Sequence, residues 1–180
     1  MSRYIAFLRA INVGGHTVKM DDLRQLFEAM DFTHVETFIA SGNVIFDSNA
    51  TNLVSLEKKI AKHLHKELGY EVATFIRTPI ELAAIAAYQP FPKAVFEAAT
   101  AFNIAFLGEA PSAVAVQKLL ALKNATDDFH VNGREVYWLC RVKQSDSKFS
   151  NVILEKTLGQ AATFRGAKTI SKMAAQYGAQ

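Results

Sequence analysis

Two segments of the sequence gather polar and cationic side chains of the kinds that bind anions. The first segment follows an apolar run at residues 4–8, and its candidate ligand-binding residues are Arg9, Asn12, Gly14, Gly15 and Lys19. Glycine permits positive φ and close backbone approach, so the N–H groups of such a loop can surround an anion beside a helix N-terminus. The same residue types also suit a flexible corner, and taken alone they leave both interpretations open.

The first segment lacks the spacing of known phosphate-binding loops. A P-loop needs Gly-Lys-Ser/Thr at the start of its helix, and a dinucleotide-binding loop needs three spaced glycines. Neither pattern occurs around Gly14-Gly15. His16 is the only evident general base beside this loop, and no nucleophile motif occurs, so the sequence does not decide whether the protein is an enzyme.

The second segment precedes a predicted helix in the C-terminal part of the chain. It offers many hydrogen-bond donors and no carboxylate between Ser147 and Val152. Its candidate ligand-binding residues are Ser147, Lys148, Ser150, Asn151 and, further along the chain, Arg165. These groups suit a phosphate or a carboxylate. The alternative is that Ser147 or Ser150 simply caps the helix.

No metal site, cofactor or disulfide is predicted. His63 and His65 are two residues apart in a helical pattern and point to different faces, so they cannot chelate as i, i+4 residues would. The single Cys140 cannot form an internal disulfide, which agrees with a reducing compartment. We expect a cytoplasmic protein, because there is no signal-type segment and no apolar run long enough to span a membrane.

The charge is distributed unevenly along the 180 residues. The net charge is +3, but residues 134–180 carry 8 Lys+Arg against 3 Asp+Glu, whereas residues 1–133 carry 12 against 14. A basic C-terminal part can attract anions or nucleic acid, although a few lysines can also just keep a surface soluble. Tyr137 could stack on a base, but one ring is not a platform.

The elements that must position these residues follow the order β-α-β-β-α-β in the first half. Four apolar residues spaced i, i+3, i+4 and i+7 between Leu23 and Met30 indicate a helix, and Ser41-Gly42-Asn43 indicates a hairpin turn. The predicted elements are a strand at 4–11, a helix from about residue 21, strands at 35–40 and 44–47, a helix at 53–68 before Gly69, and a strand at 72–77.

A connecting segment at residues 79–100 separates this first half, residues 1–78, from a second half, residues 101–180. Thr78-Pro79-Ile80-Glu81 is a capping box that predicts a helix from Pro79 to about Tyr88. The second half repeats the order, with a strand at 101–107, a helix at 112–123, strands at 128–131 and 135–140, helices at 148–158 and 168–177, and a strand at 162–165.

The turn at Asn132-Gly133 predicts the register of the hairpin in the second half. A two-residue turn there pairs Val131 with Arg134 and would place His130 opposite Glu135. Alternation along the strands then puts five residues on one core-facing side: Phe129, Val131, Val136, Trp138 and Cys140.

The fold class expected from these elements is α+β, with duplicated ferredoxin-like halves of the split β-α-β type, antiparallel-rich sheets and a C-terminal helix. The string Ile-Ala-Phe-Leu occurs at residues 5–8 and again at 104–107, in agreement with an internal duplication. This fold hosts enzymes, RNA-binding proteins and ligand-binding modules, so it does not decide the function.

Three motifs give the chain a resemblance to a known family. Tyr4–Gly15, Ser41–Phe46 and Ser147–Asn151 resemble, in this order, the bacterial domain-of-unknown-function family 1697. The resemblance implies a cytoplasmic bacterial protein with a duplicated ferredoxin-like fold, and it carries no activity, substrate or catalytic residue. The family usually has glycine at Ala10 and at Asp31, where Asp can still adopt a left-handed conformation at some cost, and asparagine at Gly166.

The resemblance also bears on the first segment. The motif includes Arg9 and Asn12 beside the glycines, and a corner that needed only flexibility would not require those two side chains. We hypothesise that this loop meets residues 147–151 across the junction of the two halves and forms a pocket for a small anionic or phosphorylated ligand. The alternatives are binding of RNA or single-stranded nucleic acid, and a protein–protein interaction module with an apolar patch around Phe91 and Phe96. The oligomeric state stays open.

Overall fold

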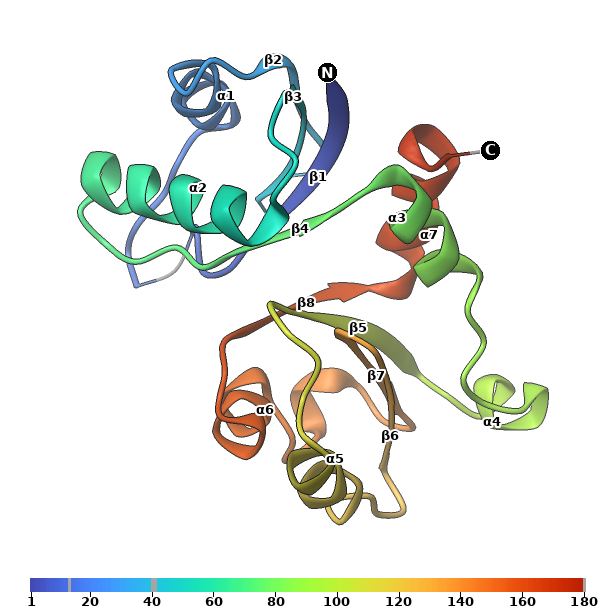
Figure 1. Cartoon of the computed structure of the whole chain (residues 1–180). Coiled ribbons are helices and arrows are strands. Elements are labelled where there is room, and N and C mark those ends of the chain that lie inside the picture. The colour runs from blue at the N-terminus through green and yellow to red at the C-terminus, as the bar shows by residue number, and fades with distance from the viewer. Residues whose placement is uncertain (13, 40–41, 180) are drawn as a thin grey trace. The chain divides into compact units, whose positions relative to one another are not determined.

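The structure is a computed structural model, and it describes residues 1–12, 14–39 and 42–179. The chain divides into two units, one formed by Met1–Leu82 with the C-terminal residues from Tyr177 on, the other by Ala83–Gln176. Each unit combines helices with a four-stranded antiparallel sheet, as Figure 1 shows. The predicted α+β fold class with two similar halves is therefore confirmed.

The first unit has the split β-α-β order that the sequence predicts. Its strands pair in the order β2-β3-β1-β4, all antiparallel. Helices α1 and α2 both cover one face of this sheet (Figure 1). The elements are β1 (Ser2–Leu8), α1 (Met20–Glu28), β2 (Thr33–Thr37), β3 (Asn43–Ser48), α2 (Leu53–Leu68) and β4 (Thr74–Arg77).

The core of the first unit lies between these two helices and one face of the sheet. Alternate residues of the strands pack against the apolar stripes of α1 and α2, which removes their side chains from water and stabilises the unit. The fully or almost fully buried members include Ala6, Leu8, Val44, Phe46, Phe27, Leu56, Ile60 and Leu64. Gly69 follows α2 with a φ of 83°, which confirms its predicted role at the helix end.

The first strand is shorter than predicted. It ends at Leu8 instead of residue 11, because Ala10 has a φ of 56° and cannot continue an extended strand. The hairpin turn expected at Ser41-Gly42-Asn43 is described only from Gly42 on, since Ala40 and Ser41 lie outside the described residues. Asn43 opens β3, and its amide group donates a hydrogen bond of 2.9 Å to the carbonyl oxygen of Phe38.

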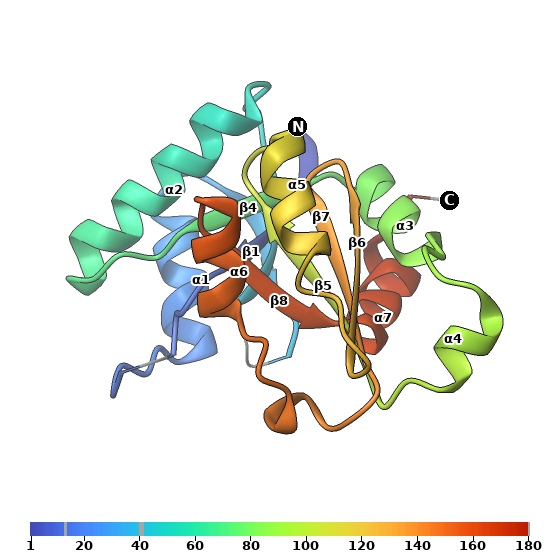
Figure 2. The same ribbon diagram turned by 90° about the horizontal axis from the view of Figure 1, so that it is seen from below.

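The second unit repeats the strand order of the first, and the pairing is β6-β7-β5-β8. Figure 2 shows the same elements from below. They are α3 (Pro79–Ala87), which starts in the first unit, α4 (Lys93–Glu97), β5 (Ala101–Leu107), α5 (Ala113–Leu120), β6 (Asp127–Asn132), β7 (Glu135–Cys140), a 3₁₀ turn (Gln144–Asp146), α6 (Asn151–Leu158), β8 (Ala162–Gly166) and α7 (Ala167–Tyr177).

The segment between α3 and β5 holds a helix that the sequence did not predict. The capping box at the start of α3 is confirmed, because Thr78 N donates to Glu81 Oε2 at 2.8 Å and Glu81 N donates to Thr78 Oγ1 at 3.2 Å. The short α4 follows, and its Phe96 ring packs edge-on against Phe102 at 4.9 Å between centroids. The packing of the Phe96 ring against Phe102 stabilises α4, which is too short to be stable through its local sequence alone.

The register predicted for the β6–β7 hairpin is wrong by one residue on each strand. Asn132 pairs with Glu135 and His130 pairs with Tyr137, so the two loop residues are Gly133 and Arg134. Gly133 has a φ of 60°, and a hairpin loop needs this positive φ at its first position, which leaves Asn132 in the strand.

The core face predicted for this hairpin is nevertheless confirmed. The cross-strand partner of each residue differs from the prediction by two positions: Val131 pairs with Val136 instead of Arg134. A shift of two positions keeps the same side chains on the same face. Phe129, Val136, Trp138 and Cys140 are buried in the core of the second unit, and Val131 packs against it. None of the helices in the described parts of the chain is both long and apolar enough to cross a membrane.

Candidate functional site

The loop after β1 is held by its own polar side chains. Asn12 Oδ1 accepts a hydrogen bond of 2.8 Å from Val18 N and so closes the loop. The ring of His16 stacks on Tyr70 with centroids 4.0 Å apart, and the Tyr70 hydroxyl donates to Ile11 O at 2.8 Å. Asn12 therefore has a structural role in this loop.

The other predicted residues of this loop differ in exposure. Arg9 is half-buried, and its backbone N donates to Ala73 O at 2.9 Å. Gly14 and Gly15 are exposed with φ values of 63° and 82°. Lys19 is the exposed N-cap residue of α1, and its side chain forms no capping hydrogen bond there. Val13, which belongs to the same motif, lies outside the described residues.

Three of the residues predicted in the second segment line a single hollow in the second unit. This hollow has a volume of about 580 Å³. No carboxylate contributes to its lining, which consists of Trp138, Gln144, Ser145, Ser147, Phe149, Ser150 and Asn151. Ser147, Ser150 and Asn151 therefore share one polar hollow, and their role in ligand binding stays a prediction.

The two predicted serines of this hollow also hold the local structure. Ser147 Oγ lies 2.9 and 2.8 Å from the two carboxylate oxygens of buried Asp127 and accepts from Phe149 N at 3.0 Å. Trp138 Nε1 donates to the same carboxylate at 2.8 Å. Ser150 is the N-cap residue of α6, and its Oγ accepts a hydrogen bond of 3.4 Å from Ile153 N. The capping interpretation for Ser150 is therefore confirmed.

Asn151 and Lys148 complete the second segment. The Asn151 amide group donates to Ala162 O at 3.0 Å, whereas its buried Oδ1 has no hydrogen-bond partner among the residues that the structure describes. Lys148 is exposed. Lys148 does not line this hollow, whereas Gln144 and Ser145 line it and are exposed, so their side chains can reach a ligand there.

Arg165 has a counterpart in the first unit. It is 8% exposed, and its guanidinium donates to Thr163 Oγ1 and Phe164 O, both at 2.8 Å; burial lowers its pKa to about 10. Arg77 is fully buried on β4 and donates to the carbonyl oxygen of the preceding residue at 2.8 Å. Each arginine pairs with the isoleucine of the repeated Ile-Ala-Phe-Leu string, Arg77 with Ile5 and Arg165 with Ile104. A buried arginine at this position is thus part of both sheets.

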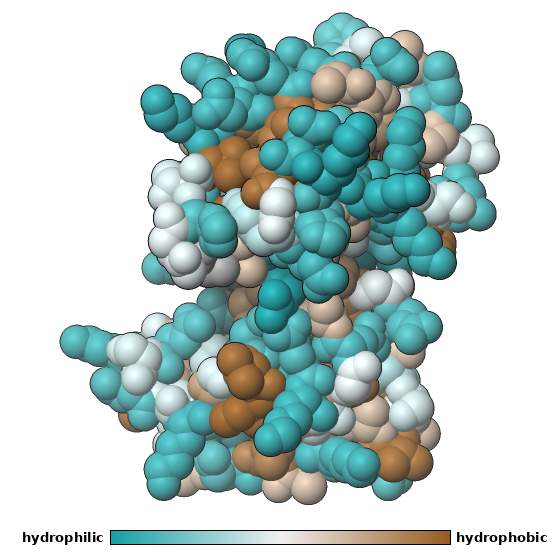
Figure 3. Space-filling view, turned by 90° about the vertical axis from the view of Figure 1, so that its left-hand side faces the viewer, coloured by the Kyte–Doolittle hydropathy of each residue, from teal (hydrophilic) through white to brown (hydrophobic). Residues whose placement is uncertain are grey.

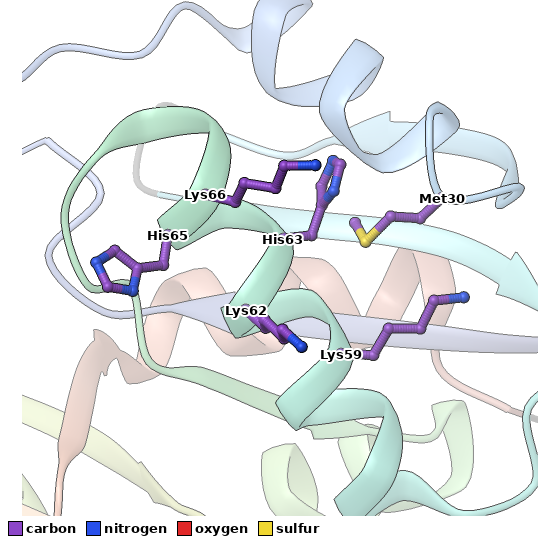
Figure 4. A pocket seen from close by; sticks show the side chains of 6 residues that line it. All are labelled: Met30, Lys59, Lys62, His63, His65 and Lys66. Carbon is purple, nitrogen blue, oxygen red and sulfur yellow. The ribbon is translucent and has the colours of Figure 1, made fainter.

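A second hollow, in the first unit, has a basic lining that the sequence analysis did not identify. Its volume is about 470 Å³, and it is lined by Met30 after α1 and by five residues of α2: Lys59, Lys62, His63, His65 and Lys66 (Figure 4). The three lysines recur at steps of three and four residues, so they share one side of the helix. All three are exposed, and none forms an ion pair within the described part of the chain.

Figure 4 shows how these side chains lie. Met30 and the His63 ring face one another, Lys66 reaches to the same side, and His65 points away. The His63 Nε2 atom is buried and has no hydrogen-bond partner among the residues described. The hollow therefore combines ammonium groups, an unpaired imidazole nitrogen and an apolar wall, a donor set that suits an anion.

The lysine spacing was visible in the sequence. The sequence pattern of α2 predicts an apolar stripe and two histidines that cannot chelate, and Figure 4 shows that the His63 and His65 rings point to different sides. A count of unpaired cations at i, i+3 and i+7 would have marked the helix as basic on one side. The sequence did not reveal that Met30, which follows α1, lines the same hollow as these lysines.

Comparison with known proteins now gives the family. A family described as a protein of unknown function (DUF1697) matches residues 1–137. The chain belongs to this family. The predicted family is therefore confirmed, and the match covers the first two of the three motifs. Membership in DUF1697 brings no specific function with it.

A solved structure agrees with the fold. The chain is similar to "The structure of conserved bacterial protein SP0830 from Streptococcus pneumoniae", with a TM-score of 0.75 and 22% identity over 98% of each chain. At this identity the likeness shows the fold alone. Among curated proteins none matches this member of DUF1697.

Proposed function

We propose that this protein binds a small anionic or phosphorylated ligand, and that the anion occupies the basic hollow beside α2. The observation that carries the proposal is the group of Lys59, Lys62 and Lys66 around one hollow, with no carboxylate among the lining residues. Each surface contact between opposite charges contributes about 0.2–1 kcal/mol, so the three lysines together contribute about 0.6–3 kcal/mol. Inorganic phosphate alone should therefore bind with a Kd of about 10 mM or weaker.

A structural explanation exists for part of this charge. Lys66 and His65 lie in the last turn of α2, where cations interact favourably with the helix dipole. That interaction falls off within one turn, so it does not account for Lys59 and Lys62. These two lysines are therefore the stronger support for an anion.

The test is an NMR titration of the full chain with inorganic phosphate at low salt. We expect saturable shifts of the α2 amide resonances, and we expect the double variant Lys62→Gln/Lys66→Gln to weaken binding about two- to thirtyfold. Lys58→Gln is the matched control, because Lys58 is exposed on the same helix but does not line the hollow. Unchanged binding by the double variant would remove this site, and no binding of phosphate, pyrophosphate or a carboxylate would remove the function.

The residues predicted from the sequence give a second location for the same function. Our hypothesis that Arg9, Asn12, Gly14, Gly15 and Lys19 form one pocket with Ser147, Lys148, Ser150, Asn151 and Arg165 stays a prediction. The exposed ammonium groups of Lys19 and Lys148 support it. If Lys19→Gln/Lys148→Gln abolishes phosphate binding and the α2 variant does not, the anion belongs there.

No observation favours the two alternative functions over anion binding. Tyr137 is 1% exposed, so its ring is not available to stack on a base. Phe91 and Phe96 are half-buried and pack against each other. Figure 3 shows a surface that is mostly hydrophilic on the side facing the viewer, with hydrophobic patches among hydrophilic side chains.

A further inference from the structure

A further hollow of about 470 Å³ adjoins the basic hollow along α2. It shares two lining residues, Met30 and Lys59, with the basic hollow. The basic hollow takes its other lining from the C-terminal half of α2. The further hollow is lined by the N-terminal half of α2, by the segment that leads into it from β3, and by Asp31 and Phe32 after α1. One ligand of moderate size can therefore occupy both hollows and pass Lys59.

The further hollow has a different chemistry, because its polar groups are hydroxyls and amides. Asn49, Thr51 and Ser55 line it, all three are exposed, and none of these side chains has a hydrogen-bond partner in the parts of the chain described. In contrast, Ser48 Oγ and Asn52 Oδ1 accept bonds of 3.1 and 3.0 Å from the backbone and are already used. Hydroxyl and amide groups both donate and accept, so the three unused side chains suit the hydroxyls of a ligand.

The charges that line the two hollows determine which end of the ligand lies in which hollow. Asp31 lines the further hollow but not the basic one, and its carboxylate repels an anion while accepting hydrogen bonds from hydroxyl groups. Lys59 stands at the boundary, where its Nζ lies 5.4 Å from the centroid of the Phe32 ring. The anionic end of the ligand belongs on the side of Lys62 and Lys66.

We infer that the ligand is a phosphorylated sugar, with its phosphate in the basic hollow and its hydroxyl groups against Asn49, Thr51 and Ser55. This inference rests on the proposed function, because it assigns the phosphate to the same lysines. The phosphorylated sugar can be a free sugar phosphate or the sugar-phosphate part of a nucleotide, since both present the same groups to the two hollows.

The experiment compares four probes on the full chain by NMR titration: inorganic phosphate, ribose, ribose 5-phosphate and AMP. We expect ribose 5-phosphate to bind at least tenfold more tightly than phosphate, and ribose to bind more weakly than both. The variant Asn49→Ala/Ser55→Ala should bring ribose 5-phosphate down to the affinity of phosphate and leave phosphate binding unchanged. Gln117→Ala, an exposed polar residue of α5 in the other unit, is the control.

Each outcome decides a different point. Equal affinities for phosphate and ribose 5-phosphate would overturn this inference and leave the proposed function intact, whereas failure of phosphate, pyrophosphate and a carboxylate all to bind would overturn the proposed function itself. A gain from ribose that survives Asn49→Ala/Ser55→Ala would overturn the placement of the sugar. AMP binding more tightly than ribose 5-phosphate supports a nucleotide, and equal or weaker binding supports a free sugar phosphate. Unchanged thermal unfolding of the variants shows that they fold.

Discussion

Two residues have a left-handed conformation at positions where the family resemblance leads us to expect glycine. Ala10 has a φ of 56° and Asp31 a φ of 63°, and glycine is the residue expected at both positions. A non-glycine residue there costs about 1–2 kcal/mol, less for Asp, which tolerates this conformation better than Ala. The left-handed conformation expected for Asp31 is confirmed. The C′ position expected for it is wrong, because Ala29 is the C-cap of α1 and Asp31 lies one residue beyond C′.

Two glycines of the first unit allow the cost of a positive φ to be measured apart from the cost of close packing. Gly42 has a φ of 75°, and a Cβ there would lie 2.9 Å from Ile11 Cγ2 and 3.0 Å from Leu8 Cβ. Gly15 has a φ of 82° with nothing within 4 Å of such an atom. We predict that Gly42→Ala lowers the free energy of unfolding by about 3 kcal/mol and Gly15→Ala by about 1 kcal/mol. Urea denaturation measures both, and equal losses would contradict the packing argument.

At the scale of the elements, Asp47 joins three strands of the first sheet. From β3 its carboxylate accepts from Arg3 Nε on β1 at 2.9 Å and lies 3.0 Å from His34 Nδ1 on β2. The hydrogen bond from Arg3, helped by the charge of Arg3 and by His34, holds the pKa of Asp47 below its ordinary value of 3.8. The carboxylate therefore stabilises the fold above the unfolded-state pKa, and this stabilisation is lost as the pH falls through the lower folded-state pKa.

We predict that Asp47→Asn lowers the free energy of unfolding by about 1 kcal/mol at pH 7 and flattens its decline below about pH 4. Denaturant unfolding at several pH values measures this. Glu97→Gln is the control, because Glu97 is 65% exposed and its 3.7 Å contact with Lys93 is a surface pair. An acid limb equally steep in wild type and Asp47→Asn would show that Asp47 is not its source.

Ser147, in the segment between β7 and α6, can be tested for a role in stability as opposed to ligand binding. Removing its hydroxyl leaves the buried carboxylate of Asp127 with Trp138 Nε1 as its remaining side-chain donor among the bonds described above. We predict that Ser147→Ala lowers the free energy of unfolding by about 1–2 kcal/mol without changing phosphate affinity. Ser145→Ala, in the same hollow but exposed, should leave stability unchanged. A loss of affinity with unchanged stability would instead assign Ser147 to the ligand.

At the scale of the whole molecule, both units place the repeated Ile-Ala-Phe-Leu string in an inner strand. β1 and β5 each have a strand on both sides, and Ile5, Ala6, Ile104 and Ala105 are at most 2% exposed. Hydrogen exchange should therefore be slowest in β1, β3, β5 and β7 and fastest in the exposed part of the loop before α1. Mass spectrometry of exchanged peptides measures this, and an edge strand such as β2 outlasting β1 would contradict it.

The element order was predictable because it depends on local periodicity. The apolar stripe of α2, the capping box at Thr78 and the apolar run of β5 each predict their element from a short stretch of sequence. The hairpin register was missed because turn preferences do not say which of Asn132 and Gly133 takes the first loop position. The short α4 was missed because its rings find their partners across the fold.

The sequence by itself determined the α+β order of elements, their similarity in the two halves and the family, since all three are written in short-range patterns. It also located polar residues around Ser147, because their spacing along the chain is short. Only the tertiary structure decided what these residues do: Asn12 and Ser147 are engaged in bonds to Val18 and Asp127, and Met30 meets the lysines of α2. The physical reason is that side-chain partners and hollows are formed by segments distant in sequence, which no local pattern records.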